Sequence, residues 1–189
     1  MTSTPPDAAR TRGRWILVGL FALFFGTVFG AGVLRFAGWQ PVNHKNSGEM
    51  LQPAIDARAV TPQLLDGGDY AWNPGERIWR IAVVAPADCG QACSKLAHDL
   101  DKVWRLFGHR ADKVEILWIG PLPADAPVTE SRKQIQATPE LLAVLPRHTD
   151  AKGAPVYVID PNGFVVLRYA PGFDAGGLYK DVSKLLKLM

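Results

Sequence analysis

The chain has 189 residues, of which 48% are hydrophobic, so it is long and apolar enough for one folded domain and a membrane anchor. The formal net charge is +3, and the whole excess lies in residues 1–38, which carry four arginines and one aspartate. The rest of the chain is neutral. Nucleic-acid binding requires a basic face, so we expect no nucleic-acid partner.

An uncharged run of 20 residues begins at Trp15 and ends at Leu34. As a helix rising about 1.5 Å per residue it would be roughly 30 Å long, the thickness of the hydrocarbon core of a bilayer. A cleaved signal peptide is the alternative, but its apolar region usually has only about 7–15 residues and ends in a small-residue cleavage site. We therefore predict an uncleaved transmembrane helix over residues 15–36.

The basic residues near this helix predict its orientation. Arg10, Arg12 and Arg14 stand directly before the apolar run, and few basic residues follow it closely. By the positive-inside rule, residues 1–14 form a cytoplasmic tail and the chain crosses the inner membrane once. Residues 37–77 are interrupted by prolines and glycines and show little periodicity, which predicts a periplasmic tether.

From about residue 78 the apolar pattern becomes regular. It predicts strands over 78–85, 114–119, 154–160 and 164–169, and helices over 94–107, from Thr138, and over 178–188. A helical crossover makes the first two strands parallel, and a turn joins the last two as an antiparallel hairpin. This order predicts an α/β, thioredoxin-like domain over residues 78–189, behind the transmembrane helix. Pro155 stands where that fold often has a cis-proline.

The only two cysteines, Cys89 and Cys93, lie in the stretch "ADCGQACSKL" between the first strand and its helix. In the first helical turn, Cys93 would feel the positive end of the helix dipole, which lowers a thiol pKa. Residues four apart on a helix can come within disulfide reach.

Three interpretations of this pair stay open. A structural disulfide suits an exported domain, but so short a loop contributes little through loop entropy. Thiol–disulfide exchange with a partner is the second interpretation. The third is a soft-metal site, because two thiolates suit Cu(I), usually with a third ligand.

The anchor, the motif "CGQAC" after the first strand and the segment "VYVIDPNGFVVLRY" before the last helix resemble the SCO/SenC proteins. These are membrane-anchored, thioredoxin-like factors that help to deliver copper to cytochrome c oxidase. The resemblance implies that Cys89 and Cys93 handle copper or thiol redox on the periplasmic side. It also implies copper as the cofactor, and a cytochrome c oxidase subunit or another assembly factor as the partner.

Two features depart from the SCO pattern. The motif "CGQAC" lacks the prolines that are usual in that family. The family's copper histidine stands a few residues before the hairpin strand, whereas His148 precedes Val156 by eight residues. We take Cys89, Cys93 and His148 as candidate metal ligands, with an exposed loop residue as the alternative for His148. The other histidines are assigned to a helix surface (His98), a helix end (His109) and the tether (His44).

We therefore predict a SCO-like assembly factor for a respiratory cytochrome oxidase, acting on copper or thiols through Cys89 and Cys93. One alternative is a membrane-anchored periplasmic thiol–disulfide oxidoreductase, and another is an interaction scaffold with a vestigial site. A well-placed third ligand near the sulfurs would favour copper. Its absence, together with a cis Pro155, would favour thiol exchange.

Overall fold

The computed structural model describes residues 7–36 and 46–188, which belong to two separate units. The first unit contains one long helix, α1 (Asp7–Phe36). Its segment Arg12–Phe36 has a mean hydropathy of 2.3 and is long enough to cross a membrane. The predicted transmembrane helix, residues 15–36, lies within α1. Helix α1 begins at Asp7, so it also includes the arginines that precede the apolar run. Residues 1–6 of the predicted tail lie outside the described residues.

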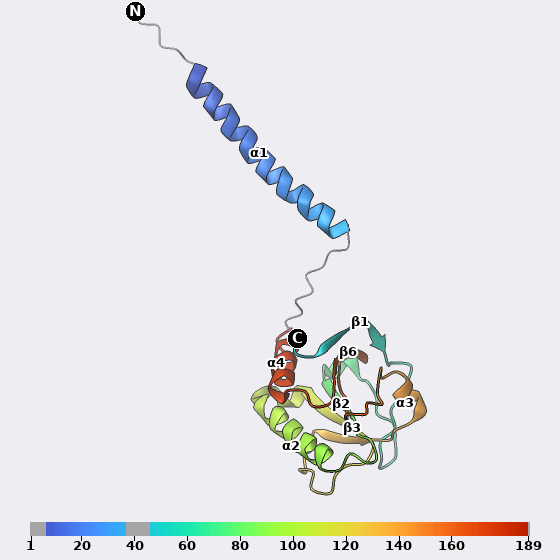
Figure 1. Cartoon of the computed structure of the whole chain (residues 1–189). Helices are drawn as coiled ribbons and strands as arrows, with labels where there is room; N and C mark the ends of the chain where they lie inside the picture. The colour runs from blue at the N-terminus through green and yellow to red at the C-terminus, as the bar shows by residue number, and fades with distance from the viewer. Residues whose placement is uncertain (1–6, 37–45, 189) are drawn as a thin grey trace, which may run out of the picture. The chain divides into compact units, whose positions relative to one another are not determined.

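The second unit is built on a six-stranded mixed sheet in the order β1-β6-β5-β2-β3-β4 (Figure 1). The strands are β1 (Glu49–Asp56), β2 (Trp79–Val84), β3 (Val114–Ile119), β4 (Arg132–Ile135), β5 (Val156–Ile159) and β6 (Phe164–Tyr169). Strand β2 runs parallel to β3 and antiparallel to β5, and β5 runs antiparallel to β6. These pairings confirm the predicted crossover and hairpin.

Helices cover both faces of this sheet. They are α2 (Gly90–Leu106), α3 (Pro139–Ala143) and α4 (Ala175–Leu185), with short 3-10 turns at Pro74–Glu76 and Gly108–Lys113. Thr138 caps α3, as predicted, by accepting a hydrogen bond from the Leu141 backbone N–H.

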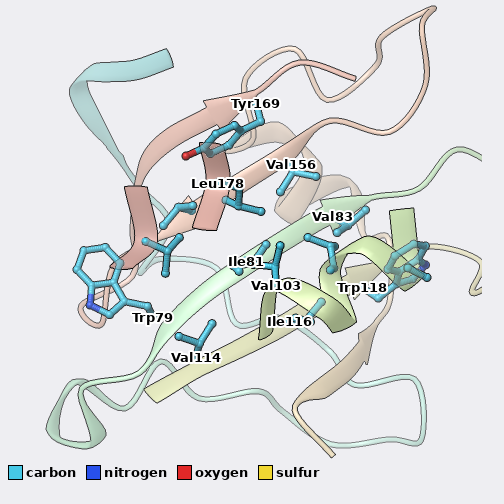
Figure 2. Packing of buried hydrophobic residues seen from close by; sticks show 14 of the residues in the cluster. Trp79, Ile81, Val83, Val103, Val114, Ile116, Trp118, Val156, Tyr169 and Leu178 are labelled. Atoms are coloured by element: carbon cyan, nitrogen blue, oxygen red, sulfur yellow. The ribbon is translucent and has the colours of Figure 1, made fainter. Parts of the chain in front are cut away.

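The buried residues form one apolar layer on each side of the sheet. Because side chains alternate along a strand, Ile81 of β2 faces α2 and α4, while its neighbour Ala82 faces α3. Figure 2 shows Val103 of α2 and Leu178 of α4 packed beside Ile81. Strand β2 is buried at all six positions, so it provides a rigid support for the segment that follows it.

Residues 46–77, which were predicted as part of a tether, belong to the folded unit. Strand β1 pairs antiparallel with β6 at one edge of the sheet, and residues 46–77 all fall within the second unit. The buried Arg80 guanidinium donates hydrogen bonds to the Trp72 carbonyl at 2.7 Å and to the Tyr70 hydroxyl at 2.8 Å, which fixes the end of this segment. Residues 37–45 of the predicted tether lie outside the described residues.

Asp181 of α4 holds the start of β1 in place. Its carboxylate, which is 2% exposed, accepts hydrogen bonds from the backbone N–H groups of Ser47 at 2.6 Å and Gly48 at 3.0 Å, and from the Tyr169 hydroxyl at 2.9 Å. A side chain at Gly48 would collide with the Tyr169 ring, because a Cβ atom there would lie 2.5 Å from it. The point at which the chain enters the domain is therefore fixed.

Candidate redox site

The site begins where the buried strand β2 ends. The Cys89 backbone N–H donates a hydrogen bond to the Pro86 carbonyl at 3.3 Å, and Cys89 is the N-cap residue of α2. Gly90 follows with a φ of +50°, in the left-handed region that favours glycine, so the chain can turn sharply there. This turn brings Cys89 and Cys93 onto the same end of α2.

Cys89 and Cys93 form a disulfide with a Cα–Cα distance of 5.4 Å, which is ordinary for such a bond. The two sulfurs have different surroundings. Cys93 is only 1% exposed and belongs to the apolar core, whereas Cys89 is partly exposed at its edge. Solvent and partners can therefore reach the disulfide mainly through Cys89.

Two surface hollows flank the disulfide. The first, of about 430 Å³, is lined by both cysteines and by residues 121–125 of the loop after β3. The second, of about 310 Å³, is lined by Cys89 but not by Cys93. Its other walls come from α2 and from the segments 152–154 and 171–173. Cys89 thus stands between the two hollows.

A polar cluster lies at one wall of the first hollow, which Ser94 and Asp125 line. Asp125 accepts a short hydrogen bond from the Ser94 hydroxyl and lies 3.7 Å from Nε2 of His98. The bond from Ser94, with a smaller contribution from His98, lowers the pKa of Asp125 below its ordinary value. His98 is exposed on α2, as predicted, but it also faces the loop that carries Asp125.

Apolar and basic side chains line the second hollow. Leu96 and Phe173 contribute apolar surface, and Lys95 and Lys152 contribute ammonium groups. Lys95 is paired with Asp99 at 2.5 Å. None of these five residues carries a sequence pattern that indicates the hollow, because they come from helix and loop positions that only the tertiary fold brings together.

His148 lies in the loop after α3, with Nδ1 3.2 Å from the Leu145 carbonyl oxygen. Buried Arg168 holds this loop by donating to the Arg147 carbonyl at 3.3 Å and to Asp150 at 3.2 Å. His148 lines neither hollow. Across residues 7–36 and 46–188, no group of three or more His, Cys, Asp or Glu side chains is arranged to hold a metal. The structure therefore brings the two cysteines together without His148, whose role as a copper ligand stays a prediction.

Pro155 lies beside this site at the start of β5. Its carbonyl accepts a hydrogen bond from the Val84 backbone N–H at 3.2 Å, and the two residues before it, Gly153 and Ala154, line the second hollow with Cys89. Within the described ranges the one cis peptide bond is Gln52–Pro53, so the bond before Pro155 is trans. The cis-proline that would have favoured thiol exchange is therefore not present at this position.

The family model for a "transmembrane-like, thioredoxin-like, C-terminal domain" matches residues 79–189. The chain belongs to this family. The match begins with β2 and includes both cysteines, so the disulfide lies within the thioredoxin-like domain. Among curated proteins, none matches the chain in sequence.

Solved structures share the fold of this thioredoxin-like domain. An apo Sco1 protein from Thermus thermophilus covers 77% of this chain and 99% of its own, with 12% identity and a TM-score of 0.53. BsSco, described as a member of the Sco family of cytochrome c oxidase assembly proteins with a disulfide switch, covers 75% and 98%, with 12% identity and a TM-score of 0.52. A thiol:disulfide interchange protein from Bacteroides sp. covers 74% and 90%, with 18% identity and a TM-score of 0.47.

Proposed function

We propose that this protein is a membrane-anchored thiol–disulfide exchange protein that acts through Cys89 and Cys93. The unequal exposure of the two sulfurs carries this proposal, because exchange needs one sulfur that a partner can reach and one that is protected. Open hollows on both sides of Cys89 would give a partner access to the disulfide, and a purely structural disulfide does not require such access. The short loop between the cysteines would also contribute little to stability.

In the exchange, a partner thiolate attacks Sγ of Cys89 and forms a mixed disulfide. The Cys89–Cys93 bond breaks, and its electron pair leaves on Sγ of Cys93, which takes a proton from solvent. A second partner thiolate then attacks the partner sulfur of the mixed disulfide. This step yields an oxidised partner and a reduced cysteine pair, and the reverse sequence reduces a partner disulfide.

The position of Cys89 suits the thiolate form of the reduced site, whereas Cys93, for which the sequence predicted the dipole effect, is 1% exposed, and apolar burial disfavours a thiolate. Cys89 caps a helix of 17 residues, and the positive end of the helix dipole favours a negative charge there. The arginines before the apolar segment favour a cytoplasmic N-terminus and a periplasmic domain anchored in the inner membrane. Such an oxidising compartment would preserve the disulfide.

Trapping of a partner tests this function. Cys93→Ser leaves Cys89 free to form a mixed disulfide that no second cysteine of the chain can resolve, so we expect covalent complexes with partner proteins on non-reducing gels. Cys89→Ser should give almost none, because Cys93 is buried. Equal trapping by both variants, or none by either, would contradict the proposal.

The second candidate function is SCO-like assembly of a cytochrome oxidase, with copper as cargo. The CxxxC spacing and the fold shared with BsSco favour it. After reduction, Cys89 and Cys93 would offer two thiolates, a donor set that suits Cu(I). A cytochrome c oxidase subunit or another assembly factor would then be the partner. Titration of the reduced protein with Cu(I) tests this candidate, and absence of binding would remove it.

A further inference from the structure

We propose that the second hollow receives a partner cysteine that is flanked by an acidic side chain, and that Lys152 recognises this acid. The inference rests on the proposed exchange function and adds to it the class of partner and the side from which the partner approaches. Access, charge and the rigidity of the loop that carries Lys152 support it.

Access to the reactive sulfur favours the second hollow. A thiolate attacks a disulfide sulfur from the side opposite to the sulfur that leaves. Cys93, the leaving sulfur, lines the first hollow but not the second, whereas Cys89 lines both. A partner sulfur in the second hollow would therefore meet Cys89 without Cys93 in its way.

The charge of the second hollow favours an acidic partner. Asp99 is its one carboxylate among the described residues, and it is already shared by Lys95 at 2.5 Å and Lys102 at 3.6 Å. The Lys152 ammonium forms no ion pair with any described residue, and Lys152 is exposed. Asp150 attracts this ammonium at longer range, but the Asp150 carboxylate is already paired with Arg168 at 3.2 Å. Asp88 precedes Cys89 in the chain but lines neither hollow.

The backbone that carries Lys152 is fixed. Asp150 accepts a hydrogen bond from the Lys152 backbone N–H at 3.0 Å, and its carbonyl accepts one from Gly153 at 3.1 Å. The second carboxylate oxygen of Asp150 accepts a hydrogen bond from buried Arg168 at 3.2 Å. Lys152 is thus held at the mouth of the hollow, while Leu96 and Phe173 offer apolar surface to the rest of a peptide.

Three matched peptides test the inference, each with a single cysteine followed by Glu, Gln or Lys. Each peptide reduces the oxidised full-length protein in detergent, and the rate of loss of the Cys89–Cys93 bond is followed by mass spectrometry. The ratio of the Glu rate to the Lys rate should fall about two- to fivefold in Lys152→Gln, the range of an exposed ion pair. High salt should reduce the ratio for the unchanged protein in the same direction.

The matched control is Lys187→Gln, which removes an exposed lysine after α4 that lines neither hollow and does not pair with Asp99. This variant should keep the ratio of the unchanged protein. An unaltered ratio in Lys152→Gln, or an equal fall in Lys187→Gln, would overturn the inference. The Gln peptide tests the exchange function separately from the recognition of an acid by Lys152. If this peptide fails to reduce the disulfide in any form of the protein, the exchange function itself is wrong and the inference falls with it.

Discussion

Asp125 accepts a hydrogen bond from Ser94, the residue that directly follows the buried sulfur of Cys93. The contact joins the proline-rich loop after β3 to the first turns of α2. Nε2 of His98 lies 3.7 Å from the same carboxylate. The wall of the first hollow is therefore attached to the helix that carries the disulfide.

This contact should depend on pH in a defined direction. The pKa of Asp125 is lowered from its ordinary 3.8, chiefly by the bond from Ser94, so the folded state favours the carboxylate. Its contribution to stability is present above the ordinary pKa and is lost as the pH falls through the lowered value. We expect NMR titration of Asp125 to give a pKa below 3.8, and Ser94→Ala to move it upward. A pKa that does not change in Ser94→Ala would show that the bond is absent in solution.

Two leucines of α2 differ in burial, so their substitution tests how this helix packs on the core. Leu100 is 1% exposed and packs against the sheet, whereas Leu106 is 62% exposed. Leu100→Ala should lower the free energy of unfolding by about 2–5 kcal/mol, because it leaves a cavity. Leu106→Ala should change it by only about 0.5 kcal/mol or less. Urea denaturation of both variants measures this difference, and equal losses would contradict the packing of α2.

The hydrogen bonds that Asp181 accepts at the start of β1 can be tested by substitution. Asp181→Ala would leave the backbone N–H groups of Ser47 and Gly48 and the Tyr169 hydroxyl without their acceptor. We expect a loss of about 1–3 kcal/mol in the free energy of unfolding and faster amide exchange in β1. Tyr169→Phe, which removes one of the three donors, should have a smaller effect. Unchanged exchange in β1 would mean that Asp181 does not hold that strand.

The orientation in the membrane can be measured directly. A reporter that is active only outside the cytoplasm, fused after Met189, should be active, because the arginines precede the apolar segment. Moving the charge, by changing Arg10, Arg12 and Arg14 to Glu and adding lysines after Phe36, should reduce this activity. Activity of a cytoplasmic reporter at the same position would overturn the proposed topology.

Much of this fold can be predicted from the sequence, because its central strands are apolar runs with clear ends. Strands β3 and β6 have the predicted bounds, and the two cysteines lie at the predicted junction of strand and helix. The edge strands carry no such signal. In β1 only Leu51 and Ile55 are partly buried, and β4 has one buried residue, Ile135, so pairing with neighbouring strands rather than local pattern defines them.

The site could be predicted only in part for a related reason. The cysteine pair is a local motif, so the sequence alone indicates it. Asp125 and Lys152 line the hollows beside the disulfide because the loops after β3 and before β5 both pass near the N-terminus of α2. The residues of the loop after β3 carry no local pattern that predicts the contact of Asp125 with Ser94. The position of His148 in the sequence predicts a metal ligand. In the structure its Nδ1 lies 3.2 Å from the Leu145 carbonyl oxygen, and Arg168 donates a hydrogen bond to the carbonyl of the preceding residue.

The proposed exchange function is tested most directly in the reduced protein, in which Cys89 should react and Cys93 should not. We would measure the rate of alkylation of each cysteine as a function of pH, with mass spectrometry of the peptides that contain them. Cys89 should react faster by at least about tenfold and titrate below the ordinary thiol pKa of about 8.5, because it is partly exposed at a helix N-terminus. Faster reaction of Cys93, or equal reaction of both with ordinary thiol pKa values, would contradict the account.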